Sequence, residues 1–188
     1  MRIIAGKHRG RKLAAPEGPA VRPTSDRARE SLFDILAHGR FSETDACRDA
    51  MVLDAFAGTG AFGLEALSRG ARRASFIERD RTARTMLLQN ITTLGETQNA
   101  AVVSGDATRP PRATGGCSLI FLDPPYDEEI APSALKALVQ SGWIADEALV
   151  IVEISSKNNL EPPEHFTMLE ERRYGAAKFV FLRYQRVN

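Results

Sequence analysis

The sequence Asp54-Ala-Phe-Ala-Gly58-Thr-Gly60-Ala-Phe-Gly63 decides the fold, because it sets the pattern G-x-G-x-x-G between an apolar run and a helical pattern. Residues 51–55 are typical of a buried strand, and the residues after the glycines are typical of a helix up to about residue 69. Glycines here let the backbone turn tightly and approach a ligand, while free N–H groups of the first helical turn can bind it. The segment therefore predicts a nucleotide-like ligand at the end of a strand.

The same alternation of strand and helix continues after the glycine-rich turn. Further strands are predicted at residues 74–77, 100–104, 118–122 and 148–154, and helices at 81–94 and 130–140. This order is typical of a parallel sheet with helices on both faces. Residues 166–173 and 177–186, around a turn at Tyr174-Gly175, are expected to add an antiparallel pair at one edge. We therefore predict an α/β fold with a seven-stranded, mostly parallel sheet.

Acidic residues near the glycines favour S-adenosylmethionine over NAD as the ligand. Asp54 ends the first strand, where a carboxylate would attract the α-ammonium group of S-adenosylmethionine and repel the pyrophosphate of NAD. Glu78 lies 20 residues beyond Gly58, the spacing at which an acid binds ribose hydroxyls in either cofactor. Asp106 follows the third strand and could contact the adenine amine. As structural alternatives, Asp54 could cap the next helix, Glu78 could be a surface acid, and Asp106 a plain turn residue.

The strand at 118–122 runs into Asp123-Pro124-Pro125-Tyr126, a turn made rigid by two successive prolines. Such a turn at the carboxyl edge of a sheet can aim the Asp123 carboxylate and the Pro124 carbonyl at one –NH2 group. An aromatic amine is a poor nucleophile because its lone pair is delocalised, and two acceptors would help to point that lone pair at a methyl sulfonium. Tyr126 could stack on the base. The pattern predicts methylation of an exocyclic nucleobase amine, with a plain turn and a packing tyrosine as the alternative.

Positive charge is concentrated at the N-terminus. Residues 1–29 hold eight Lys and Arg but two acidic residues, a net charge of +6, whereas the whole chain carries +1. Residues 2–5 and 11–15 flank Gly-Lys-His-Arg-Gly, which predicts a small β-hairpin, followed by a proline-containing linker and an amphipathic helix from Ser25 to about Gly39. We expect residues 1–24 to contact a nucleic-acid backbone and residues 25–188 to form the main domain. A solvated basic loop is the alternative.

The composition limits the remaining classes of protein. It is typical of a soluble protein, with 43% hydrophobic and 26% charged residues and no apolar run of the roughly 18 to 20 residues that span a membrane. The first residues lack the apolar region of a secretory signal, so we expect a cytoplasmic protein. Cys47 and Cys117 lack CxxC spacing and a nearby His cluster, which predicts no metal site and no disulfide. Neither lies in a Pro-Cys turn, which argues against cytosine-C5 methylation.

The motifs together resemble those of the RsmD family of bacterial small-subunit ribosomal RNA guanine-N2 methyltransferases. The resemblance covers essentially the whole chain and rests on the glycine-rich segment with the following Gly-Leu-Glu65-Ala-Leu-Ser-Arg69-Gly, on Asp123-Pro-Pro-Tyr126, and on Arg22-Pro-Thr-Ser-Asp26-Arg27-Ala-Arg29-Glu30-Ser-Leu-Phe33. The last segment combined with Asp-Pro-Pro-Tyr is the most specific feature. Ala55 and Phe62 depart from the family pattern, where Leu is more usual, but the glycines are intact.

The resemblance implies a class I S-adenosylmethionine-dependent methyltransferase domain (Rossmann-like) that methylates the N2 amine of one guanine in small-subunit ribosomal RNA, within an assembling or assembled small subunit. The implied catalytic residues are Asp123, Pro124 and Tyr126. The residues implied at the cofactor are Asp54, Phe56, Gly58, Thr59, Gly60, Glu78, Arg79, Asp106, Ala107, Arg22 and Thr24. Those implied at the RNA are Lys7, His8, Arg9, Arg11, Lys12 and Arg27. Arg29 and Glu30 could equally form a solvated surface pair.

Three other functions remain open at this point. An adenine-N6 methyltransferase on DNA or RNA would use the same two acceptors, because either exocyclic amine fits them. A glutamine-modifying enzyme acting on protein would typically carry Asn in place of Asp123 and would not need a basic hairpin. A non-catalytic RNA-binding assembly factor could retain the cofactor pocket without turnover.

Overall fold

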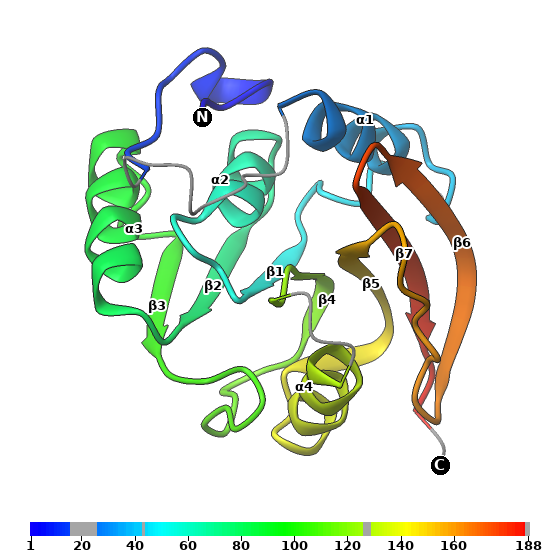
Figure 1. The fold of residues 1–188 in the computed structure, drawn as a ribbon. Helices are drawn as coiled ribbons and strands as arrows, with labels where there is room; N and C mark the ends of the chain where they lie inside the picture. Colours follow the sequence, from blue (N-terminus) through cyan, green and yellow to red (C-terminus); the bar gives the residue numbers. More distant parts are fainter. Residues whose placement is uncertain (16–25, 43, 126–128, 187–188) are drawn as a thin grey trace.

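The computed structural model describes residues 1–15, 26–42, 44–125 and 129–186. Its centre is a seven-stranded sheet with the order β3-β2-β1-β4-β5-β7-β6 (Figure 1). The strands are β1 (Met51–Ala55), β2 (Arg73–Glu78), β3 (Ala100–Ser104), β4 (Cys117–Leu122), β5 (Ile144–Ser155), β6 (Phe166–Tyr174) and β7 (Ala177–Tyr184). The helices are α1 (Asp26–Ala37), α2 (Ala61–Ser68), α3 (Arg81–Leu94) and α4 (Ile130–Gln140), preceded by a 3-10 turn, η1 (Gly6–His8).

The strand order creates a switch point between β1 and β4. The first five strands run parallel, and β1 pairs with β2 on one side and with β4 on the other. Since the chain moves outward from β1 in both directions, the connections diverge there and leave a crevice at the carboxyl ends of these two strands. The glycine-rich segment follows β1 and Asp123 follows β4, so the fold brings the two main motifs to this crevice.

The predicted sheet is confirmed, including its antiparallel edge. β7 pairs antiparallel with β5, and β6 pairs antiparallel with β7 at the end of the sheet. β5 begins at Ile144, earlier than predicted, because Ile144 pairs with Cys117 before a register shift restores the ladder at Leu119 and Leu149. No described helix is long and apolar enough to cross a membrane.

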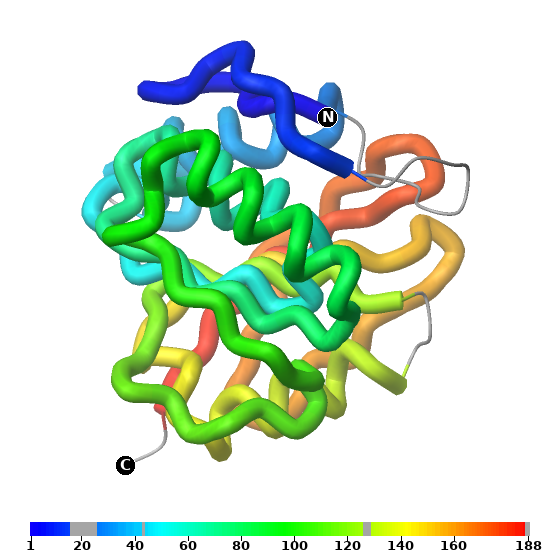
Figure 2. Tube along the Cα trace, turned by 90° about the vertical axis from the view of Figure 1, so that its left-hand side faces the viewer, coloured from blue at the N-terminus to red at the C-terminus, as the bar shows by residue number. Residues whose placement is uncertain are grey.

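Helices cover both faces of the sheet with two separate apolar clusters. Leu32, Leu64 and Leu87, from α1, α2 and α3, pack in one cluster against one face. Leu135 and Leu138 of α4 belong to the cluster on the other face. The N-terminal segment lies outside the first helical layer, beside α2 and α3, as Figures 1 and 2 both show. The sheet therefore lies between two layers of helices, and the loops with the predicted site residues lie at the carboxyl ends of its parallel strands.

Residues 1–15, which we call the arm, differ from the predicted β-hairpin. The chain does reverse, with an antiparallel bridge between Arg2 and Lys12 and a 2.9 Å bond from the Ile3 N–H to the Arg11 carbonyl. However, the described residues of the arm form no strand, and the tip is the 3-10 turn. The reason is that the N–H groups of Ile4 and Ala5 donate to the Glu65 carboxylate of α2, so side chains of the main domain replace a β-ladder here.

Candidate active site

The glycine-rich loop, residues 56–60, leaves β1 through a series of left-handed backbone conformations. Phe56, Gly58 and Gly60 have φ values of 63°, 54° and 88°. A Cβ atom built on Gly60 would lie 2.4 Å from Leu87 Cδ1, so both conformation and space require glycine there. A Cβ on Gly58 would meet nothing within 4 Å, so the backbone at Gly58 borders open space that a ligand can approach. This is the geometry that the sequence pattern predicts for the loop.

Asp54 lies under this loop at the end of β1 and is 1% exposed. Its Oδ2 accepts a 2.8 Å hydrogen bond from the Gly63 N–H, so the carboxylate caps the first turn of α2, the alternative role considered above. Burial raises the pKa of Asp54 to about 8 and Glu78 adds to the rise, against hydrogen bonds from the backbone of Gly63 and Phe62. A buried carboxyl group of this kind is suited to a cationic ligand, which would stabilise its charged form.

Glu78 joins the end of β2 to the glycine-rich loop. It is 9% exposed, and its carboxylate accepts one hydrogen bond from the Gly58 N–H and one from the Asp80 N–H, both at 2.7 Å. The surface-acid alternative is therefore wrong. The contact with Gly58 places the Glu78 carboxylate against the backbone of the glycine-rich loop; the ribose contact of Glu78 stays a prediction.

Asp106 and Arg79 face each other at the ends of β3 and β2. Arg79 Nη1 lies 3.7 Å from Asp106 Oδ2, and both side chains are exposed enough to meet a ligand. Asp106 Oδ1 accepts 2.8 Å bonds from the N–H and hydroxyl of Thr108, which hold the pKa of Asp106 below its usual range. Ala107 is buried. The adenine contact of Asp106 and the cofactor contact of Ala107 stay predictions.

Asp123 lies at the crevice between β1 and β4. Its N–H donates to the Ala55 carbonyl across 3.5 Å, which ties the Asp-Pro-Pro-Tyr turn to the end of β1. Burial, followed by the neighbouring Glu153 and Asp54, raises the pKa of the Asp123 carboxyl well above its usual range. Pro124, the next residue, is buried. The structure thus places the predicted amine acceptor next to the start of the glycine-rich loop.

Part of the predicted site lies outside the described residues. Arg22 and Thr24, predicted at the cofactor, and Tyr126, predicted to stack on the base, belong to this part.

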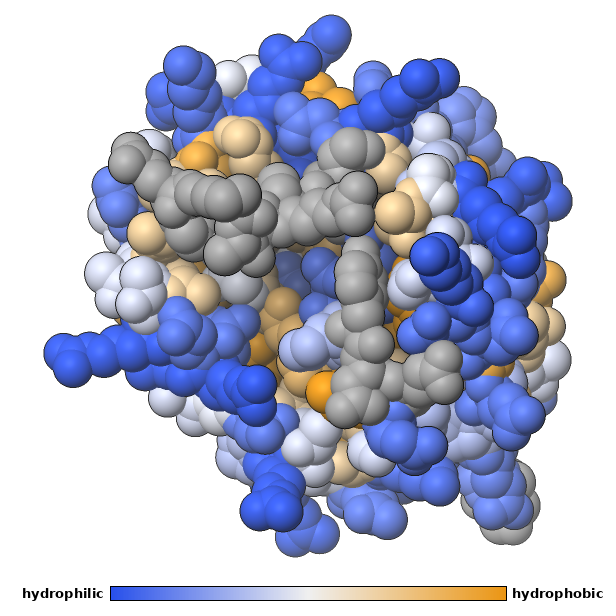
Figure 3. Space-filling model, in the orientation of Figure 1, coloured by the Kyte–Doolittle hydropathy of each residue, from blue (hydrophilic) through white to orange (hydrophobic). Residues whose placement is uncertain are grey.

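The face of the molecule shown in Figure 3 has hydrophilic residues around its margin and apolar residues near its middle. Among the residues that the structure does describe, no group of three or more His, Cys, Asp or Glu could hold a metal ion.

The predicted RNA-binding residues fall into two groups, one paired with a buried carboxylate and one exposed. Lys7 Nζ and His8 Nε2 lie 2.7 and 2.5 Å from Glu96 Oε1, and Glu96 is 1% exposed. These two side chains therefore anchor the arm to the end of α3. Arg9, Arg11, Lys12 and, on α1, Arg27 are exposed.

Polar residues that the sequence analysis missed bind the arm. Glu65 accepts the Ile4 and Ala5 N–H groups at 2.8 and 3.0 Å, and Ser68 Oγ accepts from the His8 N–H and donates to the Ala5 carbonyl. Glu65 is fully buried. A signal was present in the sequence, because Glu65 is the one charged residue of the helix Ala61–Ser68, whose other residues are apolar except for Ser68.

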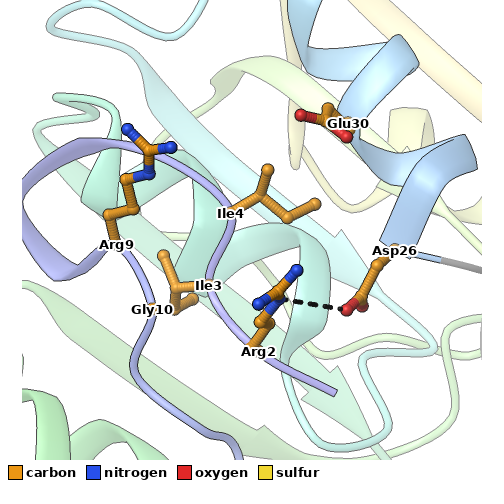
Figure 4. Close-up of a pocket in the computed structure, with 7 residues that line it drawn as sticks. All are labelled: Arg2, Ile3, Ile4, Arg9, Gly10, Asp26 and Glu30. Carbon is orange, nitrogen blue, oxygen red and sulfur yellow. Dashed lines mark ion pairs between the residues drawn. The ribbon is translucent and has the colours of Figure 1, made fainter.

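Arg29 is buried rather than part of a solvated pair. It is 1% exposed, and its Nη2 donates to the Arg2 carbonyl at 2.5 Å and to Asp26 Oδ1 at 3.0 Å. Burial lowers the pKa of Arg29, against the attraction of Asp26 and Glu65. The arm and α1 border a hollow of about 140 Å³ beside this contact, where Arg2 points toward Asp26 and Glu30 lies on the helical side (Figure 4). Arg29 thus joins α1 to the arm.

Similar proteins support the assignment of the fold. The family model described as "Conserved hypothetical protein 95" matches residues 1–183. "Ribosomal RNA small subunit methyltransferase D" of Escherichia coli is 40% identical over 181 residues, which cover 95% of this chain and 87% of the relative. "Putative rRNA methyltransferase YlbH" of Bacillus subtilis is 34% identical over 182 residues, which cover 93% of this chain and 94% of the relative.

Solved structures of similar proteins have the same fold. The structure described as "Putative methyltransferase yhhF from Escherichia coli" superposes with a TM-score of 0.82 at 37% identity, over 98% of both chains. A putative methyltransferase complexed with SAH shares the fold at a TM-score of 0.61, with 16% identity, over 82% of this chain and 49% of that one. The family model spans nearly the whole chain, and the relatives match along the same length. The resemblance inferred from the motifs is confirmed: the chain belongs to the RsmD family of ribosomal RNA small-subunit methyltransferases.

Proposed function

We propose that this protein transfers a methyl group from S-adenosylmethionine to the exocyclic N2 amine of a guanine in small-subunit ribosomal RNA. The observation that carries the proposal is the position of Asp123 at the β1–β4 crevice, tied to the end of β1 and adjacent to the glycine-rich loop. Relatives named as ribosomal RNA methyltransferases support the substrate class. The choice of guanine N2 rests on the family resemblance.

The residues around the glycine-rich loop fit S-adenosylmethionine. Asp54 is a buried carboxyl group with a raised pKa, which a cationic amino-acid group would stabilise in its charged form. Glu78 holds the backbone of Gly58, whose other side is open, and Asp106 lies at the next strand end. When bound, S-adenosylmethionine supplies an electrophilic methyl group on its sulfonium.

Asp123 and Pro124 would orient the substrate amine. The Asp123 carboxylate and the Pro124 carbonyl accept the two amine hydrogens, so that the lone pair of the nitrogen is free to form the new C–N bond. As this bond forms and the S–C bond breaks, the amine loses one proton. Asp123 is suited to receive it because burial, Glu153 and Asp54 raise its pKa above that of an exposed aspartate.

The exposed cations of the arm would bind the RNA backbone. Arg9, Arg11 and Lys12 are exposed and form no ion pair with any other described residue. Lys7 is partly neutralised by Glu96, so we assign it mainly to anchoring the arm. Each phosphate that an arginine or lysine neutralises releases counterions, which makes binding depend on salt.

Product analysis tests the proposal. The protein is incubated with labelled S-adenosylmethionine and small ribosomal subunits that lack the modification, and the RNA is digested and examined by mass spectrometry. We expect N2-methylguanine. N6-methyladenine would instead identify the adenine enzyme, and unmodified RNA would favour a non-catalytic assembly factor.

Substitution of Asp123 tests its role. In Asp123→Ala we expect the rate of methylation to fall by a factor of about 100 or more, the scale for removing an oriented polar group from a reaction centre. The affinity for S-adenosylhomocysteine should stay within about twofold, since Asp54 and Glu78 are intact. Glu164→Ala is the control, because the Glu164 side chain is 88% exposed; unchanged turnover in Asp123→Ala would refute the assigned role.

A further inference from the structure

One buried side chain contacts both the arm and the glycine-rich loop. Asn90 lies on α3 and is 2% exposed. Its Oδ1 accepts a 2.7 Å hydrogen bond from the Ala14 N–H, and its Nδ2 donates to the Ala14 carbonyl at 3.1 Å and to the Thr59 carbonyl at 3.0 Å. Both amide protons of Asn90 are therefore used, one on each partner.

We propose that Asn90 couples the arm to the glycine-rich loop, so that RNA bound to the arm raises the affinity for the cofactor. By thermodynamic reciprocity, the cofactor then raises the affinity for RNA by the same factor. This inference rests on the proposed function, because it takes RNA as the ligand of the arm. Asn90 acts as a positioning residue and does not itself contact the reacting atoms.

The loop needs such support because of its backbone. Thr59 stands between Gly58 and Gly60, both with positive φ, and glycines lose more conformational freedom on ordering than other residues. A fixed donor on the Thr59 carbonyl therefore restricts a segment that would otherwise sample several conformations. The amide plane of Asn90 is in turn fixed by its paired bonds to Ala14. If Ala14 moves away, Asn90 loses two of its three hydrogen bonds and can rotate off Thr59.

The other anchors of the arm lie elsewhere. Glu65 and Ser68 bind residues 4, 5 and 8 at the C-terminal end of α2, and Glu96 binds Lys7 and His8 beyond α3. Arg29 of α1 binds the Arg2 carbonyl. None of these contacts includes the glycine-rich loop. Ala14, by contrast, follows Arg11 and Lys12 by two to three residues, so phosphates held by these cations would restrict the residue that positions Asn90.

The test measures S-adenosylhomocysteine affinity by equilibrium dialysis of the labelled ligand, with and without saturating unmodified small subunits. For the unsubstituted protein we expect the subunits to raise the affinity at least fivefold, the lower end of typical coupling between sites. In Asn90→Ala the affinity without RNA should fall several-fold, and the ratio with and without RNA should approach one. Asn90→Asp keeps an acceptor for the Ala14 N–H but loses both donors, so its ratio should also approach one.

Gln89→Ala is the matched control. Gln89 precedes Asn90 on α3 and also carries a side-chain amide, but it is exposed, whereas Asn90 is buried. Its dialysis results should equal those of the unsubstituted protein. Thermal unfolding of each variant shows which ones are folded.

Two outcomes overturn the coupling: a ratio of one in the unsubstituted protein, or a ratio of fivefold or more in a folded Asn90 variant. If the subunits are methylated but the ratio is one, the coupling fails and the proposed function stands. If the subunits are neither bound nor methylated, the proposed function itself fails and the coupling falls with it.

Discussion

The raised pKa of Asp54 predicts that cofactor binding releases a proton. The pKa of this buried carboxyl is about 8, so about nine in ten molecules carry the proton on Asp54 at pH 7. An ammonium group beside the carboxyl favours its charged form and lowers its pKa. We therefore expect binding of S-adenosylhomocysteine to release up to about 0.9 proton at pH 7, and the release should fall toward zero as the pH rises well above 8.

Isothermal titration in buffers with different ionisation enthalpies measures this release. The observed enthalpy should vary linearly with the buffer enthalpy, and the slope gives the number of protons. Asp54→Asn removes the titrating group but keeps an oxygen that can accept from the Gly63 N–H, as the Asp54 carboxylate does at 2.8 Å. In this variant the slope should fall close to zero while α2 stays capped.

The same group affects the ligand-free protein. Since the pKa of Asp54 rises from an ordinary value near 4 in the unfolded chain to about 8 on folding, the folded state binds its proton more tightly. The free energy of unfolding should therefore decrease as the pH rises from about 4 to about 8, and Asp54→Asn should reduce that decrease. A binding slope near zero at pH 7 in the unsubstituted protein, or one that persists in Asp54→Asn, would refute the pairing of Asp54 with the cofactor ammonium.

Two further predictions concern packing and RNA binding. In Gly63→Ala the new Cβ would lie 2.4 Å from the ring of Phe76, so the free energy of unfolding, measured with urea, should fall by about 1–3 kcal/mol. Gly115→Ala is the control: a Cβ there meets nothing within 4 Å, and the free energy of unfolding should change by less than about 0.5 kcal/mol. Equal stabilities of the two variants would contradict the packing argument. Replacing Arg9 and Arg11 together with Ala should reduce the slope of log affinity for RNA against log salt by about 1.4, the value for two contacts with single-stranded phosphates. An unaltered slope would mean that the arm is a solvated loop.

Most elements of the fold could be predicted because their signals are local. The helix Arg81–Leu94 matches the prediction at both ends, since Asp80 accepts from the Ala83 N–H at its start and Gly95 adopts φ 72° at its end. The strands β1, β3 and β4 are short, largely apolar runs of five or six residues. The arm could not be predicted in the same way, because the N–H groups of Ile4, Ala5 and His8 donate to side chains some 60 residues away in the chain.

The predicted site residues also differ in whether their positions follow from local sequence signals or from long-range packing. Asp54 and Glu78 lie at the ends of β1 and β2, and Asp123 directly follows β4. Because the sheet aligns these strand ends, the positions of the three residues at one edge could be inferred from the order of elements alone. The contacts of Lys7 and His8 with Glu96, and the burial of Arg29, depend on how the arm and α1 pack on the main domain. The residues next to a Lys or His in the sequence do not indicate whether a buried carboxylate from a distant segment will contact it.

The sequence by itself determined the glycine-rich turn, the proline-rigid Asp123 turn and the alternation that makes a parallel sheet, because backbone conformation and apolar periodicity are properties of neighbouring residues. Only the tertiary structure decided that Asp54 is buried with a pKa near 8, that Lys7 and His8 anchor the arm, and that Asn90 joins the arm to the glycine-rich loop. These properties depend on desolvation and on hydrogen bonds between distant segments, which exist only once the chain is packed.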